Sequence, residues 1–183
     1  MPWIIIAVVA VLLFLFVIGI YNSLVRRRKE VDNAWAQIDV QLKRRCDLIP
    51  NLLETVKGYA AHESGVFEKV TQARSAALAA RGTGEKIAAE TNLGGALKSL
   101  MVQVEAYPEL KANRNFLALQ EELTSTENKI GFARQHYNDT ATNYNTSISL
   151  FPAVIFAGMF GFRDVELWKI TDAADREVPK IKF

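Results

Sequence analysis

The stretch "FLALQEELTSTENKIGFARQHYNDTATNYNTSISLF", residues 116–151, carries an apolar pattern whose steps alternate between three and four residues. The pattern consists of Phe116, Leu119, Leu123, Thr126, Ile130, Ala133, Tyr137, Thr140, Tyr144, Ser147 and Phe151. This spacing places one row of side chains on one face of a helix, as in a coiled coil. The stretch therefore predicts a long helix that packs along a partner helix and ends at Pro152.

A partner helix is expected at residues 23–81, where the same spacing recurs before the quoted stretch. Its apolar row is Val31, Trp35, Ile38, Leu42, Ile49, Leu52, Val56, Tyr59, Val66, Val70, Ala73, Ala77 and Ala80. Pro50 lies inside this row, and it is expected to kink the helix without ending it because proline lacks a backbone donor.

A shorter helix is expected between the two long ones, at residues 85–106. The glycines of residues 81–86, "RGTGEK", predict the turn before it. Pro108 is well placed to start the third helix, residues 109–151. The fold class that follows is all-α, with an up-and-down antiparallel helical bundle of long helices over residues 23–151.

The N-terminal residues 1–22 are expected to form a transmembrane anchor. Residues 2–21 contain no charge, and twenty helical residues span about 30 Å, the thickness of a bilayer's hydrocarbon core. A cleaved signal peptide is the competing interpretation, but it would need a basic start and a shorter apolar core. The basic cluster Arg26, Arg27, Arg28 and Lys29 predicts that the N-terminus lies outside and the bundle in the cytoplasm. These side chains could also contact anionic lipid.

The C-terminal tail, residues 152–183, is expected to pack on the bundle. Its first part belongs to an apolar run, residues 150–162, which is too short to span a bilayer. That run could contact the core, a second copy or the membrane, and the sequence favours the first two. Two short pieces, "VELWKI" at 165–170 and "VPKIKF" at 178–183, are expected to be extended.

Two charged residues, Arg45 and Glu63, fall at positions of the first apolar row. A charge inside a bundle is costly unless an opposite charge pairs with it. The third helix offers Glu127 for Arg45 and Arg134 for Glu63. We expect such pairs to fix the register between helices, although both side chains could instead reach water.

The dipeptide Tyr-Asn occurs twice, as Tyr137-Asn138 and as Tyr144-Asn145. Both tyrosines lie on the apolar row, so their rings are expected in the core with each hydroxyl bonded to a polar group. Each asparagine lies about 100° round the helix from its tyrosine, a position that suits contact with a second helix better than a lone binding pocket.

The sequence shows no constellation typical of catalysis, of a cofactor or of a metal. His62 and His136 lack any ligand spacing, and Cys46 is interpreted as an inert thiol because no base stands beside it. A net charge of +2 without a basic stripe does not favour nucleic-acid binding. We therefore expect a protein that is not an enzyme.

Several stretches resemble the LemA family. They are "YNSLVRRRKEVDNAWAQIDVQLKRRCDLIPNLLETVKGYAAHE", "YPELKANRNFLALQEELTSTENKIGFARQHYND", "YNTSISLFP" and the closing "REVPKIKF". The resemblance covers nearly the whole chain, and it implies a single-pass protein of the bacterial cytoplasmic membrane with a helical up-and-down bundle. It implies no activity and no catalytic residues.

The expected function is that of a membrane scaffold that assembles with itself. At 1.5 Å per residue, residues 22–80 would reach about 88 Å and residues 112–150 only about 58 Å. The third helix would then leave part of the first uncovered, most plainly Trp35–Leu42, and an uncovered apolar row predicts a homo-oligomer. The alternative is an adaptor or regulator of another membrane protein such as a membrane protease, near which the family's members are often encoded.

Overall fold

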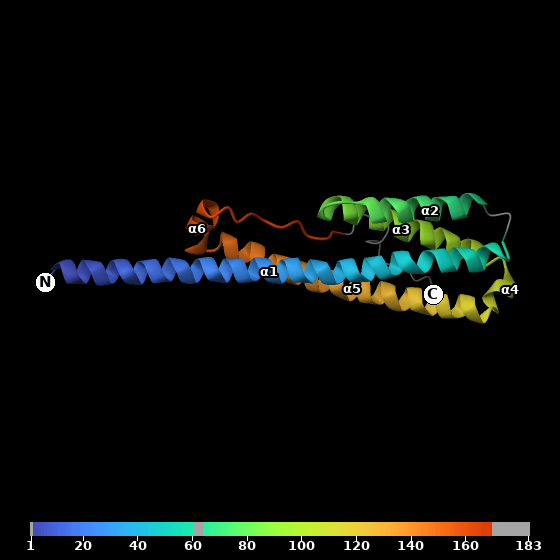
Figure 1. Ribbon diagram of the computed structural model, residues 1–183, viewed down its shortest axis with the longest axis horizontal. Helices are drawn as coiled ribbons and strands as arrows, with labels where there is room; N and C mark the ends of the chain where they lie inside the picture. Colours follow the sequence, from blue (N-terminus) through green and yellow to red (C-terminus); the bar gives the residue numbers. More distant parts are fainter. Residues whose placement is uncertain (1, 61–63, 170–183) are drawn as a thin grey trace, which may run out of the picture.

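The computed structural model describes residues 2–60 and 64–169, and within these ranges the chain is all-α (Figure 1). The helices of the described residues are α1 Pro2–Lys57, α2 Ser64–Ala79, α3 Thr83–Val104, α4 Pro108–Lys111, α5 Arg114–Ser149 and α6 Ala153–Met159. The predicted fold class is confirmed.

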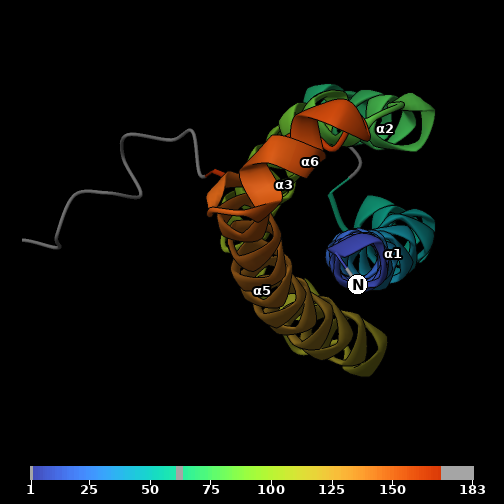
Figure 2. The same ribbon diagram turned by 90° about the vertical axis from the view of Figure 1, so that its left-hand side faces the viewer.

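The helices form an elongated up-and-down bundle. Helix α1 runs along the whole molecule, α2 turns back beside it, α3 runs forward again and α5 returns antiparallel to α1 (Figures 1 and 2). The N-terminal part of α1 projects beyond the bundle, where its apolar side chains are exposed. This part, residues 2–21, is called the apolar span below, and it is long and apolar enough to cross a membrane.

The prediction of one helix over residues 23–81 was wrong, because α1 ends at Lys57 and α2 begins at Ser64. At the end of α1 the backbone N–H groups of Tyr59 and Ala60 both donate to the Val56 carbonyl, at 3.0 and 2.9 Å. The apolar row continues past this turn because α2 packs against the same core as α1. Periodicity alone therefore does not distinguish one long helix from two helices that share a core.

Pro50 does not end its helix and Pro108 starts one, as expected. Helix α1 continues through Pro50, and Pro108 is the first residue of α4. The predicted helix 109–151 is nevertheless divided, because α4 is only one turn long and α5 starts after Asn113. The Asn113 side chain accepts hydrogen bonds from the backbone N–H groups of Asn115 and Phe116, at 2.8 and 3.1 Å, which is the usual chemistry of a helix N-cap.

The turn expected at residues 81–86 occurs between α2 and α3 but is shorter, because only residues 80–82 separate the helices and Gly84 belongs to α3. Gly82 has a φ of +79°, a left-handed conformation that glycine adopts without the steric cost of a side chain. The backbone N–H of Arg81 donates to the Glu85 carboxylate at 3.0 Å across the turn.

The core falls into two clusters that α1 and α5 share. The distal cluster, far from the N-terminus, joins α1, α2, α3, α4 and α5 around Ile49, Leu52, Val70, Leu93, Leu100 and Phe116. The proximal cluster joins α1, the start of α3, α5 and the tail around Val31, Ile38, Leu42, Ile130, Tyr137, Tyr144 and Trp168. Ile38 and Leu42 are 0% and 2% exposed, so the prediction that Trp35–Leu42 is left uncovered was wrong. The tail and α5 cover this stretch.

The apolar row of α5 shifts near its end. The buried residues after Tyr137 are Ala141, Tyr144 and Ile148, and the expected last member, Phe151, is 81% exposed beyond the helix end. An α-helix has 3.6 residues per turn, so a strict seven-residue repeat drifts by about 20° per heptad around a straight helix. The drift moves the buried face onto neighbouring residues.

The tail confirms that a non-helical piece packs on the bundle. Residues 162–169, called the strap below, leave α6 and run back along the bundle (Figure 1). Trp168 of the strap is buried in the proximal cluster, with its ring 5.8 Å from that of Trp35. The piece expected at 178–183 lies outside the described residues.

Candidate functional site

The most deeply buried charges of the described residues centre on Arg45 of α1, which is 5% exposed. Its Nη1 donates to Glu127 Oε2 of α5 at 2.6 Å, so the predicted pair is present. Its Nη2 also pairs with the carboxylate of Glu90 on α3, a residue that is only 3% exposed. One guanidinium thus joins α1, α3 and α5.

Glu90 was missed by the sequence analysis, although a signal for it exists. It follows Ile87 and precedes Leu93 by three residues each, so it occupies the apolar face of its helix. A carboxylate at such a position needs a cation nearby, and Arg45 lies at the corresponding kind of position in the first apolar row. The pattern of α3 could therefore have supplied the second partner.

The buried charges shift several pKa values. Burial lowers the pKa of Arg45, but the Glu127 and Glu90 carboxylates more than offset this, so the pKa is raised. Burial raises the pKa of Glu90 by more than the Arg45 guanidinium lowers it. Burial, followed by the charge of Glu90, raises the pKa of the Cys46 thiol to about 11. The thiol is therefore protonated near neutral pH, as the inert interpretation requires.

The second predicted pair cannot be followed, because Glu63 lies outside the described residues, as does His62. Arg134, the proposed partner of Glu63, contacts the strap. Its guanidinium carbon lies 5.6 Å from the ring centre of Trp168. A cation at this distance over an indole ring is attracted to the negative face of the ring. Arg134 thus helps hold Trp168 in the proximal cluster.

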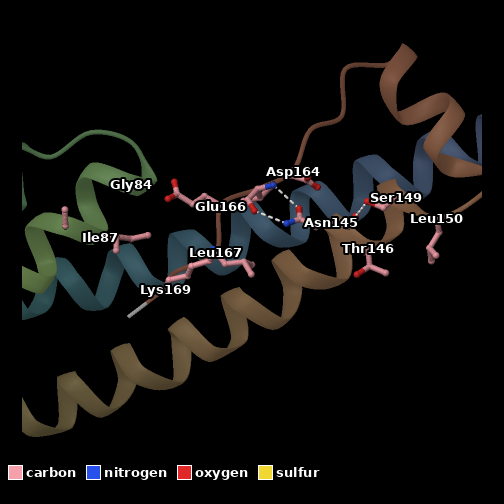
Figure 3. Close-up of a pocket in the computed structure, with 12 residues that line it drawn as sticks. Gly84, Ile87, Asn145, Thr146, Ser149, Leu150, Asp164, Glu166, Leu167 and Lys169 are labelled. Carbon is pink, nitrogen blue, oxygen red and sulfur yellow. Dashed lines mark hydrogen bonds between the residues drawn. The ribbon is translucent and has the colours of Figure 1, made fainter. Parts of the chain in front are cut away.

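The two asparagines of the Tyr-Asn repeat bind the strap backbone. The Asn145 amide donates to the Val165 carbonyl at 2.9 Å, and its oxygen accepts from the Val165 N–H at 2.9 Å (Figure 3). Asn138 makes the same two bonds with Trp168, at 3.0 and 2.8 Å. An asparagine side chain offers one donor face and one acceptor, as a strand backbone does. The expected contact with a second helix was wrong, because the partner is the extended strap.

The spacing of the repeat matches the spacing of the strap. Seven residues of α-helix advance about 10.5 Å, and three residues of extended chain advance about 10 Å. Asn138 and Asn145 are therefore in step with Trp168 and Val165. Between these two contacts the Tyr137 hydroxyl donates to the carbonyl oxygen of Glu166 at 2.7 Å. We call these three side chains and their bonds the strap clamp.

The two tyrosine rings are core residues, as expected, each 1% exposed. The ring of Tyr137 packs against Trp35 with centres 5.2 Å apart, and Arg28 lies over the ring of Tyr144 at 5.7 Å. Burial raises the pKa of the Tyr137 phenol, which keeps its hydroxyl a hydrogen-bond donor to the strap. Sequence periodicity located both rings but gave no information about the strap.

A cleft of about 800 Å³ lies between the strap, α5 and the first turns of α3 (Figure 3). Asn145, Glu166 and Lys169 line it together with Gly84 and Ile87. The Glu166 carboxylate sits so close to Gly84 that a Cβ there would lie 3.3 Å from Oε2. A carboxylate near the N-terminus of α3 is favoured by the helix dipole. The side-chain amide of Asn145 is already hydrogen-bonded to the strap backbone. The polar groups of the cleft therefore serve mainly to attach the strap.

A second surface feature lies on the outer face of α1 and α5. Val40 and Phe132 are 64% and 73% exposed, and both line one groove of about 470 Å³. Gln37, Lys129 and His136 border the same groove. We call this surface the α1/α5 face. His136 therefore belongs to a surface groove, and within residues 2–60 and 64–169 no cluster of three potential metal-binding side chains occurs.

The basic cluster is partly engaged by the protein itself. Arg28 lies 3.4 Å from the Asp32 carboxylate besides covering Tyr144, and Lys29 lies 3.5 Å from Asp32. Arg26 and Arg27 are exposed on α1 immediately after the apolar span. The cluster thus joins the span to the bundle.

Comparison with known proteins agrees with this architecture. The model of the LemA family matches residues 34–183. Protein LemA of Metamycoplasma hominis is 28% identical over 77% of this chain and 68% of its own length. Magnetosome protein MamQ of Magnetospirillum gryphiswaldense is 24% identical over 86% of this chain and 68% of its own length. These similarities and the apolar span of α1 indicate a membrane-associated helical protein.

Replacing Arg45 by methionine should lower the free energy of unfolding by about 3–5 kcal/mol, because it leaves the Glu90 carboxylate buried without its cation. The double variant Arg45→Met/Glu90→Leu should recover most of this loss. Denaturant unfolding of the protein in detergent measures both. Arg44→Met is the matched control, since Arg44 is 48% exposed and pairs with the half-exposed Glu122. Equal losses for both arginines would contradict the central position of Arg45.

The free energy of unfolding should depend on pH through the raised pKa of Glu90. Because the folded state binds this proton more tightly, its contribution is complete below the ordinary value of 4.5 and is lost as pH rises through the raised pKa. Glu90→Gln removes that titration. As pH rises through the raised pKa of Glu90, the unmodified protein loses this contribution and the variant does not. The melting temperature of the variant minus that of the unmodified protein should therefore increase with pH over this window. Parallel pH profiles would show that Glu90 does not titrate abnormally.

Asn138→Ala and Asn145→Ala should release the strap. Each change removes two hydrogen bonds, a loss of about 1–3 kcal/mol at the usual net value per bond. The backbone N–H groups of Val165 and Trp168 should then exchange with deuterium faster than in the unmodified protein. Asn143→Ala is the control, since Asn143 is exposed on the same helix. Unchanged protection of both amides in the double variant would reopen the repeat as a ligand site.

Proposed function

The chain belongs to the LemA family, and we propose that it is a single-pass membrane scaffold whose bundle assembles with further copies of itself. The carrying observation is the exposed apolar pair Val40 and Phe132 on the α1/α5 face. Scattered apolar residues are normal on a surface, but these two line the same groove. Burying them against a second copy would remove both from water.

The anchor restricts how copies can meet. Helix α1 passes without a break from the apolar span into the bundle, so the bundle's long axis continues that of the span. Copies held in one membrane would stand side by side, and contacts would form along the rod. The α1/α5 face runs along the rod and is therefore available to a neighbour, whereas the far end of the bundle is not.

The proposed location is the bacterial cytoplasmic membrane, with the N-terminus outside and the bundle in the cytoplasm. The support is the position of Arg26, Arg27, Arg28 and Lys29 directly after the span, since basic residues are retained on the cytoplasmic side. The bundle would then stand on the inner surface of the membrane.

The proposal assigns no catalytic step and no cofactor. The Cys46 thiol is buried and protonated near neutral pH, so it is a poor nucleophile. The conspicuous polar side chains of α5, Asn138 and Asn145, are bonded to the strap backbone. Both features support a structural function for the thiol and the two amides, which are the groups that would otherwise suggest catalysis or ligand binding.

The second candidate function is that of an adaptor or regulator whose α1/α5 face holds a different membrane protein, such as a membrane protease. The groove's mixed lining, with Lys129 and His136 beside the two apolar side chains, also suits a heterologous partner. The name of the relative MamQ places that protein with magnetosomes.

Cysteine crosslinking in native membranes tests the proposal. The native Cys46 is 2% exposed and should stay silent, so Phe132→Cys supplies the reactive group. A homobifunctional thiol crosslinker should yield dimers of this variant, and a membrane-impermeant thiol reagent should reach it only from the cytoplasmic side. Val102→Cys is the control, since Val102 is 62% exposed on α3.

The outcomes separate the two functions. Dimers at position 132 well above those at position 102 support self-assembly. Crosslinks at position 132 to another protein alone would favour the adaptor function, and equal background at both positions would contradict any use of the α1/α5 face. Labelling of Phe132→Cys in intact cells without access to the cytoplasm would reverse the proposed topology.

A further inference from the structure

The chain returns to the end of the apolar span after α5. Arg28 of α1 lies over the ring of Tyr144 in α5. Because the two helices are antiparallel, counting equal numbers of residues from this contact places Leu150 level with Asn22. Helix α6 therefore begins where the apolar span ends, and Figure 1 shows it beside that part of α1.

Direct contacts confirm this position. The ring of Tyr21, at the end of the apolar span, lies 5.0 Å from the ring of Phe160 and 5.8 Å from that of Phe162. Tyrosine is common at the boundary between lipid and water, where its ring lies among the headgroups. The cluster of three rings therefore marks the level of that boundary on both α1 and the tail.

Helix α6 and its flanks expose a large apolar surface at this level. Ala157 is buried against the bundle, whereas the residues on the other sides are open. The exposed apolar side chains are Leu150, Phe151, Val154, Ile155, Met159 and Phe160, between 45% and 81% exposed. Residues 150–162 contain no charged residue. Such a patch is costly in water and favourable in the outer part of a lipid leaflet.

The charges nearby stand on the aqueous side of this level. Arg26 follows Tyr21 along the helix by about 7.5 Å, the depth over which phosphate headgroups would be met. Arg163 follows directly after the uncharged run of the tail and is exposed. Both chain segments therefore pass from apolar to charged residues at the same height, α1 at Arg26 and the tail at Arg163 and Asp164, which is the order of a membrane interface.

We infer that α6, with the flanking residues 150–152 and 160–162, is a second membrane contact that lies in the lipid interface beside the apolar span. The segment has too few residues to span the bilayer, so it lies in the plane of the interface instead. The inference goes beyond the scaffold function and shares with it only the membrane location of α1. The contact would fix how the rod stands on the membrane, because a single helix alone leaves its tilt free.

Lipid-quenching fluorescence on the full-length protein tests this inference. Met159, 75% exposed, is replaced by cysteine and labelled with an environment-sensitive fluorophore, while buried Cys46 stays unlabelled. The protein is reconstituted in vesicles of phosphatidylcholine and phosphatidylglycerol that carry lipids with a nitroxide either near the headgroup or deep on the acyl chain. Phe14→Cys in the span and Val102→Cys on α3 are the two controls.

The expected result is shallow quenching at position 159 several-fold above that at position 102. Quenching at position 14 by the acyl-chain nitroxide, without quenching at position 159 by either lipid, would overturn the inference and leave the membrane span intact. Absence of acyl-chain quenching at position 14 would overturn the span, and with it the proposed scaffold. A blue-shifted emission at position 159 without lipid quenching would mean that a second copy covers α6, which also overturns the lipid contact.

Discussion

The antiparallel packing of α5 against α1 is the constraint on which the rest of the structure depends. Both helices supply residues to the distal and the proximal core clusters, so their contact extends over nearly the whole bundle. The apolar span forms the first part of α1. An antiparallel α5 therefore ends near the end of that span, and the tail begins there. The position of α6 and of the strap follows from the direction of a single helix pair.

Apolar packing of two long helices leaves their register poorly defined, because a shift by one heptad would bury a similar row of side chains. Arg45 opposes such a shift. Its guanidinium reaches Glu127 on α5 and Glu90 on α3. Moving α3 by one heptad along α1 would leave Arg45 and Glu90 buried apart, whereas moving α5 would cost Arg45 its contact with the half-exposed Glu127. A buried ion pair adds little net stability after the cost of desolvation, but separating its partners is expensive. The interaction therefore acts more on which arrangement forms than on how stable it is.

The sequence was informative wherever the determining feature repeats along the chain. The long helix over 116–149 and the pair of Arg45 with Glu127 could both be predicted from apolar periodicity and from one misplaced charge. The break after Lys57 could not, because α2 continues the apolar row of α1 after the turn. The clamp could not either, since the strap has no period and its contact with Asn145 spans 20 residues of sequence. The only signal of these side chain to backbone hydrogen bonds in the sequence is the seven-residue spacing of the two asparagines.

That spacing has a mechanical meaning. Helix α6 has only seven residues, and isolated helices shorter than about 12 residues are marginal in water. It is therefore ordered by what holds its two ends. Helix α5 fixes the end before it, and the strap clamp fixes the chain after it, because Asn138 and Asn145 grip the strap at two points that match its extended length. The Tyr-Asn repeat thus fixes the strap to the bundle, and the fixed strap in turn holds α6 and its apolar surface at the end of the apolar span.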